Sequence, residues 1–145
     1  LTLHLGNKTL RLWHTPGHSP DSIVCLLKED RILVAADTIM PVPYFVDGSY
    51  DDFLLSLEAL RQENLECVIQ GHGEIILRGE IEDKLRTDIT YLRRLNSAVE
   101  RALDATVPEK ALDAISIEDC GISRILLNVL ALAAQRRVLS RQPQA

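Results

Sequence analysis

The chain has 145 residues, of which 46% are hydrophobic and 26% charged, a composition typical of one soluble globular domain rather than a disordered or collagen-like chain. Its 16 basic and 21 acidic residues give a formal net charge of −5 with no basic block, so we expect no nucleic-acid partner. The longest strongly apolar stretch, 125–134, is about half of the roughly 20 residues that a membrane span needs, so we expect no membrane partner.

Short strands separated by turns dominate the first half of the chain. The runs over 22–27 and 31–36 are apolar on both faces, which is typical of strands that are covered on each side. In chain order, the predicted elements are strands over 9–13, 22–27 and 31–36, a helix over 51–64 and a strand over 66–70.

Helical periodicity replaces this pattern in the second half. Apolar residues recur every three or four positions over 79–105, which predicts one long helix with a single buried seam. Shorter helices are predicted over 108–115 and 123–139. The fold class is therefore α/β, with layers over 1–79 and a helical region over 80–145 that packs on the same domain.

The start of the chain and its cysteines bear on location. The first residue is Leu1 rather than methionine, so the start reads as cut, and no signal peptide is in view. Three cysteines, Cys25, Cys67 and Cys120, are an odd number at wide spacing, which argues against a disulfide framework or a four-thiolate zinc site. We expect reduced thiols in the core of a cytoplasmic protein.

Three polar residues stand where predicted strands end. His18 follows a Pro-Gly turn, Asp37 ends the apolar run over 32–36, and His72 lies between two glycines after the strand over 66–70. A carboxylate at the tip of a covered strand is costly unless it is paired, hydrogen-bonded or bound to a cation. Strand ends are also where α/β proteins commonly place their sites.

The chemistry of this set favours divalent metals. Imidazole nitrogen and carboxylate oxygen suit zinc, and also iron or manganese. A carboxylate can bridge two metals about 3.5–4 Å apart, as in two-metal hydrolysis, so the set indicates metal-assisted hydrolysis of a small-molecule substrate. Taken singly, a histidine after a turn is usually a surface residue, and an Asp-Thr after a strand is often only a cap.

Together the three segments resemble a known family. Residues 15–19 (Thr-Pro-Gly-His-Ser), 35–38 (Ala-Ala-Asp-Thr) and 71–73 (Gly-His-Gly) are similar, in order, to the last three signature elements of the metallo-β-lactamase superfamily. The resemblance covers roughly residues 10–76, about half of the chain. It implies the C-terminal half of a four-layer αββα sandwich, with appended C-terminal helices.

The resemblance also implies roles for individual residues. His18 matches the third ligand of the first metal, Asp37 the bridging carboxylate of the catalytic centre, and His72 the histidine of the second metal. In the intact family member, two divalent metals, zinc above all, activate a water that attacks an ester, thioester, lactone or lactam carbonyl.

Two features depart from the family pattern. Ala36 stands where a glycine commonly precedes the aspartate, which is a small change in backbone freedom. The upstream His-x-His-x-Asp-His motif, which supplies the remaining ligands and the acid/base carboxylate, is absent from these 145 residues. A two-metal site needs about four ligands per ion, so we expect this chain by itself to bind metal weakly or not at all and to lack hydrolysis.

The loop over 38–50 is the candidate wall of a substrate pocket beside Asp37. It contains two prolines and three aromatic residues, and Tyr44 and Phe45 are the predicted substrate contacts. A packed surface loop is the alternative interpretation. The other histidines, His4 and His14, are predicted not to be ligands.

Two further functions and one assembly state remain open. A non-enzymatic binding or assembly module would keep His18, Asp37 and His72 only as structural hydrogen bonders. An iron-dependent sulfur dioxygenase shares the fold and similar motifs. Strands that are apolar on both sides would lose part of their cover in this chain, so we expect an exposed apolar patch and a homo-oligomer.

Overall fold

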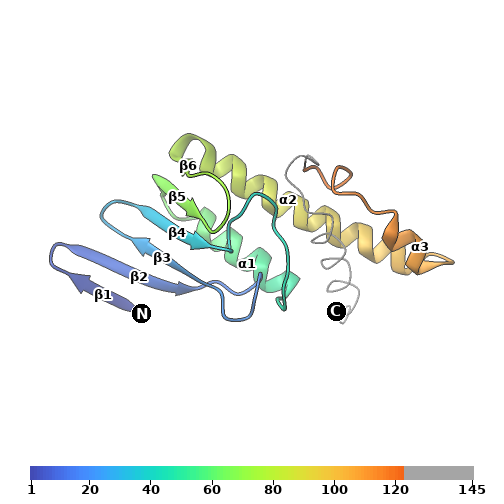
Figure 1. Ribbon diagram of the computed structural model, residues 1–145, viewed down its shortest axis with the longest axis horizontal. Coiled ribbons are helices and arrows are strands. Elements are labelled where there is room, and N and C mark those ends of the chain that lie inside the picture. Colours follow the sequence, from blue (N-terminus) through green and yellow to red (C-terminus); the bar gives the residue numbers. More distant parts are fainter. Residues whose placement is uncertain (123–145) are drawn as a thin grey trace.

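Six strands form one mixed sheet in the computed structural model, which describes residues 1–122 (Figure 1). The strands lie side by side in chain order, and β1 to β4 form an antiparallel meander. β5 runs parallel to β4, and β6 returns antiparallel to β5. Their bounds are β1 (Thr2–Leu5), β2 (Lys8–His14), β3 (Ile23–Leu27), β4 (Ile32–Ala36), β5 (Cys67–Gln70) and β6 (Ile76–Leu77).

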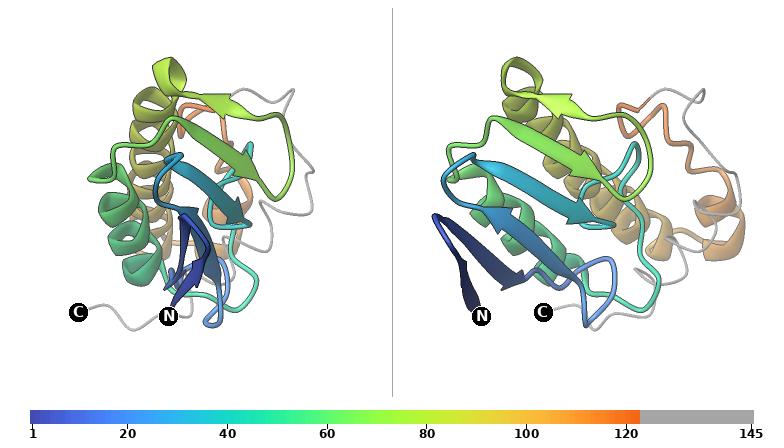
Figure 2. Two further views of the ribbon diagram at one scale, coloured as in Figure 1. Left: turned by 90° about the vertical axis from the view of Figure 1, so that its left-hand side faces the viewer. Right: turned by 60° about the vertical axis from the view of Figure 1, so that its left-hand side comes forward.

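Two long helices cover one face of this sheet (Figure 2). α1 (Tyr50–Arg61) makes the crossover between the parallel strands β4 and β5, and α2 (Arg78–Leu103) follows β6 and packs against α1. A short α3 (Pro108–Asp113) packs against α2. Within residues 1–122, none of the helices combines the length and the apolar character needed to cross a membrane.

Local sequence explains where α1 begins. The Ser49 hydroxyl caps the helix by accepting a hydrogen bond from the backbone N–H of Asp52, and Asp51 and Asp52 place negative charge in the first turn. Phe53, Leu57 and Leu60 then lie on one stripe and are fully buried.

The predicted elements agree with the structure apart from their ends. The four predicted strands correspond to β2, β3, β4 and β5, and the helices over 51–64, 79–105 and 108–115 correspond to α1, α2 and α3. The α/β class is confirmed. β1 and β6 were not predicted as separate strands, the helix over 123–139 lies outside the described residues, and the domain division at residue 79 stays a prediction.

The core lies between the sheet and the two helices. Alternate residues of the strands point toward the helices, so Leu33, Ala35 and Val68 are fully buried, together with Phe53 of α1 and Leu92 of α2. The helix seam predicted from Ile81 onward is part of the same core.

The opposite face of the sheet is open and apolar in the part of the chain that the structure describes. Val34 pairs with Cys25 on one side and with Ile69 on the other, and Val34 and Ile69 are 44% and 37% exposed. We call the residues of this surface the open sheet face; they include Ile23, Cys25, Val34, Cys67, Ile69 and Leu77. Within residues 1–122, the second face of β3 and β4 is therefore exposed, and the apolar patch expected from the loss of part of their cover is present.

The prediction that the cysteines lie in the core requires a correction. None of the three forms a disulfide, and Cys120 is buried, but Cys25 and Cys67 are half-buried on the open sheet face. Both cysteines stand in apolar strand sequences, which predicted buried positions. In a strand that is apolar on both faces, however, the alternation of side chains does not tell which face is covered.

Self-association should follow from the open sheet face, because contiguous apolar surface of this kind favours contact with another apolar surface. We expect the 145-residue chain to sediment as a species larger than a monomer at micromolar concentration. Val34→Lys, which places a charge at the centre of the face, should shift it toward monomer. Leu55→Lys, an exposed position on α1, is the matched control and should leave the distribution unchanged. A monomeric wild-type chain would contradict the expectation.

Two charged residues of α2, Lys84 and Asp88, form an ion pair that is largely buried. Lys84 Nζ lies 2.6 and 2.7 Å from the two carboxylate oxygens of Asp88, one helical turn further on, and the Asp88 side chain is only 1% exposed. Burial raises the pKa of Asp88 from 3.8 to about 6, because removing the carboxylate from water outweighs the attraction of the Lys84 ammonium.

This raised pKa predicts a pH-dependent stability. The folded state binds the Asp88 proton more tightly than the unfolded chain, so the contribution of Asp88 to stability is complete below pH 3.8 and is lost as the pH rises through about 6. Between about pH 5 and pH 7, the free energy of unfolding of the wild type should fall relative to that of Asp88→Asn. Urea unfolding across this range measures the difference. Asp83→Asn, on the exposed side of α2, is the control.

Candidate metal and active site

His18 is placed by the loop that leaves β2. Gly17 has a φ of 148°, and a Cβ there would lie 2.4 Å from the Phe53 Cα, so only glycine allows the loop to approach α1 this closely. The loop is fixed further by a 2.9 Å hydrogen bond between the hydroxyls of Thr15 and Thr38. His18 is consequently well buried, at 7% exposed.

Asp37 follows directly on β4. The preceding Ala36 has a φ of 44°, in the left-handed region that favours glycine, and the β4–β5 register shifts between Val34 and Ala36. This irregularity turns the chain out of the sheet at Asp37.

His72 follows β5, the parallel neighbour of β4. The Gly71 N–H donates a 2.7 Å hydrogen bond to the Ala36 carbonyl, which holds the two strand ends together. A Cβ on Gly71 would lie 2.1 Å from Asp37 Oδ1, so glycine is required for this close approach. The His72 side chain is 70% exposed and faces solvent more than His18 does.

The three predicted ligands converge on the Asp37 carboxylate. His18 Nε2 lies 3.8 Å from Asp37 Oδ2, and His72 Nε2 lies 3.5 Å from Asp37 Oδ1. Each carboxylate oxygen therefore faces one imidazole nitrogen. Both separations are longer than ordinary hydrogen bonds, so Asp37 is near each histidine without a direct hydrogen bond to either.

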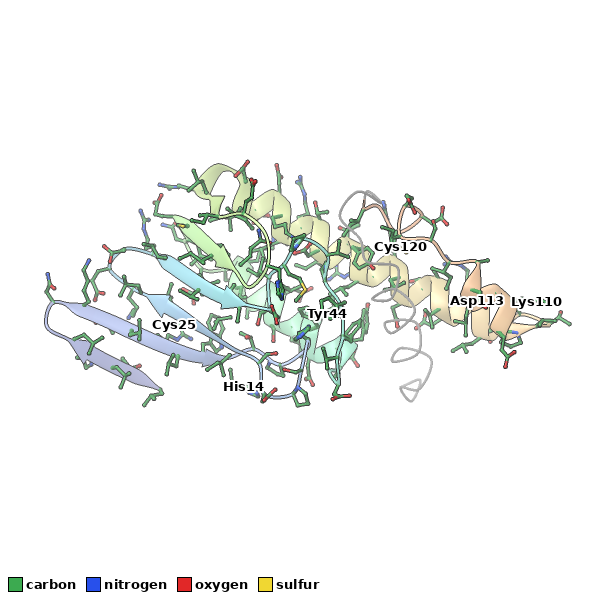
Figure 3. The ribbon with its side chains drawn as sticks, viewed as in Figure 1. His14, Cys25, Tyr44, Lys110, Asp113 and Cys120 are labelled. Carbon is green, nitrogen blue, oxygen red and sulfur yellow. The ribbon has the colours of Figure 1, made fainter. Side chains whose placement is uncertain are left out.

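The His18 ring is oriented by the loop after Asp37. Its Nδ1 lies 2.8 Å from the backbone carbonyl oxygen of Tyr44, and a carbonyl can only accept, so Nδ1 is the protonated nitrogen. Nε2, which faces Asp37, then keeps its lone pair for a metal. The Tyr44 ring packs edge-on against the His18 ring, with centroids 4.8 Å apart. Figure 3 shows the Tyr44 side chain on the loop between β4 and α1. Sequence reasoning missed this role of the Tyr44 backbone.

The two predicted pocket residues differ in position. Tyr44 is half-buried beside His18, so its contact with substrate stays a prediction. Phe45 is only 1% exposed and packs edge-on against Phe53 in the core, with ring centroids 5.6 Å apart. A side chain this buried offers no surface to a substrate, so the predicted role of Phe45 is corrected to one in core packing.

The remaining histidines lie apart from this cluster. His14, at the end of β2, has its Nε2 2.7 Å from the Pro20 carbonyl, and His4 lies on the edge strand β1. Neither has a contact with Asp37 among the ion pairs of the described residues.

The donor set fits a metal, although it is incomplete. Within residues 1–122, no group of three or more His, Cys, Asp or Glu side chains is arranged to hold one ion. The His18–Asp37 and His72–Asp37 distances instead define two imidazole–carboxylate pairs that share Asp37. Each pair provides about half of the four ligands that zinc usually takes, so the arrangement matches half of a two-metal centre with a bridging carboxylate.

The close approach at Gly71 generates a prediction. Gly71→Ala should force Asp37 and the end of β4 away from β5, lowering the free energy of unfolding by roughly 1–3 kcal/mol, as overpacking usually does. Urea unfolding measures the effect. Gly79→Ala is the matched control, because nothing lies within 4 Å of its added Cβ and alanine favours the helix there by up to about 1 kcal/mol. Equal free energies of unfolding for the two variants would contradict the close approach of Gly71 to Asp37.

Comparison with known proteins identifies the lineage. No family model matches the chain. It is 25% identical over 111 residues to an atrochrysone carboxyl ACP thioesterase of Claviceps purpurea, covering 77% of this chain and 35% of that protein. It is 34% identical over 68 residues to a β-lactamase-like protein 2 homolog of Caenorhabditis elegans, covering 47% of this chain and 23% of that protein. The chain thus spans only about a quarter to a third of these curated relatives.

Solved structures share the fold. A metallo-β-lactamase family protein from Thermus thermophilus matches with a TM-score of 0.61 and 23% identity, over 72% of this chain and 37% of that one. A β-lactamase domain protein from Burkholderia ambifaria matches with a TM-score of 0.58 and 18% identity, over 70% of this chain and 34% of that one. These solved structures show that the chain corresponds to one part of their fold. Lactamase-like curated relatives that are 30–34% identical to this chain, together with the three motif segments, show that the chain belongs to the metallo-β-lactamase superfamily.

Proposed function

We propose that the chain is the C-terminal part of a metal-dependent hydrolase, with His18, Asp37 and His72 as its share of a two-metal centre. The observation that carries the proposal is the Asp37 carboxylate, whose two oxygens each face a different histidine. Zinc suits this donor set, and iron or manganese are alternatives. When bound, such ions lower the pKa of water and polarise a carbonyl group.

The chain's own residues orient the donors. The Tyr44 carbonyl holds the His18 imidazole with Nε2 toward Asp37, which fixes the ring before any ion arrives. The Asp37 side chain is 38% exposed, so solvent and small ions reach it. His72 is the most exposed of the three and therefore forms the side of the site nearest to an incoming small-molecule substrate.

A thioester is the substrate class that the comparisons favour. Curated relatives from Claviceps purpurea and Pseudocercospora fijiensis are named atrochrysone carboxyl ACP thioesterases. Esters, lactones and lactams undergo attack at the same kind of carbonyl and belong to the same proposal.

Two parts of the proposal concern the surroundings of the protein. Three cysteines outside any disulfide favour a reducing compartment such as the cytoplasm. The open sheet face favours a homo-oligomer in the absence of a covering layer. A purely structural role for the three polar residues is less well supported, because it provides no reason for both histidines to face one carboxylate.

Zinc titration of the 145-residue chain tests the site. We expect weak zinc binding, because three side chains cannot complete two coordination shells, and no turnover of a thioester or of nitrocefin. His18→Ala, Asp37→Ala and His72→Ala should each weaken this binding by at least roughly tenfold. His14→Ala is the control and should not change it.

Two results would overturn parts of the proposal. Zinc binding that is insensitive to all three substitutions would remove the metal site. Tight stoichiometric zinc with measurable turnover would show that these 145 residues are a complete hydrolase rather than a part of one.

A further inference from the structure

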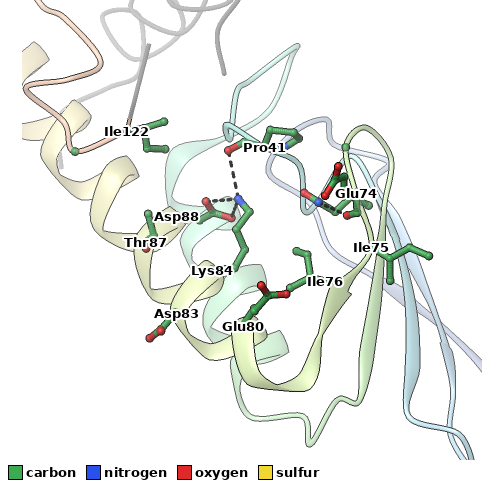
Figure 4. Close-up of a pocket in the computed structure, with 13 residues that line it drawn as sticks. Pro41, Glu74, Ile75, Ile76, Glu80, Asp83, Lys84, Thr87, Asp88 and Ile122 are labelled. Carbon is green, nitrogen blue, oxygen red and sulfur yellow. Dashed lines mark hydrogen bonds and ion pairs between the residues drawn. The ribbon is translucent and has the colours of Figure 1, made fainter. Parts of the chain in front are cut away.

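The Lys84 side chain joins α2 to the loop that follows Asp37. Figure 4 shows its ammonium between the Asp88 carboxylate and the Pro41 carbonyl of the facing loop. Nζ donates to the Met40 carbonyl at 2.6 Å and to both oxygens of Asp88 at 2.6 and 2.7 Å, and the Pro41 carbonyl lies at 3.5 Å. Three short contacts match the three N–H donors of an ammonium.

The loop held in this way supports His18. We call residues 38–49 the site loop, because they run from Asp37 to the start of α1. The Tyr44 carbonyl of this loop accepts the His18 Nδ1–H at 2.8 Å, and the Val46 N–H donates to the His18 carbonyl at 2.8 Å. The site loop is therefore hydrogen-bonded to both the side chain and the backbone of His18.

Stability alone does not account for the buried pair. Lys84 and Asp88 line a cavity of about 740 Å³ between α2 and the segment after β5, and the Asp88 side chain is 1% exposed. Removing two charges from water costs several kcal/mol per ion, and apolar residues of similar size are often equally or more stabilising. What apolar side chains cannot provide is a directional hydrogen bond to the Met40 carbonyl.

We propose that Lys84 is a positioning residue for His18: by holding the Met40 carbonyl against α2, it sets the site loop so that the Tyr44 carbonyl selects the Nδ1–H form of the imidazole. Asp88 orients the ammonium and neutralises it. The consequence for metal binding rests on the proposed function, because it takes His18 Nε2 as a ligand. The effect on the imidazole itself does not depend on that function.

The protonation form of His18 gives a direct readout. Long-range ¹H–¹⁵N spectra of the labelled 145-residue chain distinguish Nδ1–H from Nε2–H imidazole, and His18→Gln assigns the His18 signals. In Lys84→Met, the ratio of the Nε2–H form to the Nδ1–H form should rise by roughly tenfold, the size of one lost hydrogen bond. Lys110→Met, at an exposed lysine of α3, is the matched control and should leave the spectrum unchanged.

A double variant separates positioning from stability. Lys84→Met leaves Asp88 buried without its partner and can reduce folding, whereas Lys84→Met with Asp88→Leu removes both charges and should restore stability. If Lys84 positions His18, the double variant unfolds at a urea concentration close to that of the wild type and still shows the altered His18 spectrum. If the double variant shows the wild-type His18 spectrum, Lys84 is only a stabilising residue and the proposal is overturned.

Zinc affinity is the second measurement that tests the proposal. The double variant should bind zinc roughly tenfold more weakly than the wild type, the lower end of the effect of residues that orient ligands. Wild-type affinity in the double variant would contradict the link between Lys84 and the ligand. Zinc binding that is insensitive to His18→Ala, Asp37→Ala and His72→Ala, together with an altered His18 spectrum in the double variant, would overturn the proposed metal site and leave the positioning role of Lys84 standing.

Discussion

The parallel pairing of β4 with β5 is the constraint on which the candidate site depends. Because the two strands run in the same direction, with Val34 opposite Ile69, the residues that follow them leave the sheet at one edge. β2 also runs in this direction, since it is antiparallel to β3 and β3 is antiparallel to β4. The three polar residues after these strands are thus neighbours in space although they are far apart in sequence. Any change that slipped the β4–β5 register would separate them.

Much of this arrangement could be predicted because it depends on local sequence patterns. The strand runs, the turn glycines and the residue types at the strand ends identified His18, Asp37 and His72 without coordinates. The short edge strands β1 and β6 were missed, since they have few residues in which to show a period. The different positions of Tyr44 and Phe45 could not be predicted either, because loop residues have no period that tells the buried side from the exposed one.

Other features depend on tertiary contacts that no local pattern reports. The support of His18 comes from a backbone carbonyl, and every residue has one. Asp88 did carry a signal, since it falls within the apolar seam of α2, between Leu85 and Leu92, and one turn after Lys84. A carboxylate at such a position indicates a buried partner, but only the fold shows that the same lysine also reaches Met40. Whether the second sheet face is covered likewise depends on residues outside these strands, so the strand sequences alone do not predict it.

The left-handed Ala36 has an evolutionary consequence. Holding a residue with a Cβ in this region costs on the order of 1–2 kcal/mol. Glycine would avoid that cost, yet it would lose about 0.5–1 kcal/mol through the greater freedom of its unfolded chain. The net advantage of glycine is then at most about 1.5 kcal/mol, so a chain can carry alanine here at a modest cost in stability, and the alanine by itself is no sign that the neighbouring carboxylate has fallen out of use.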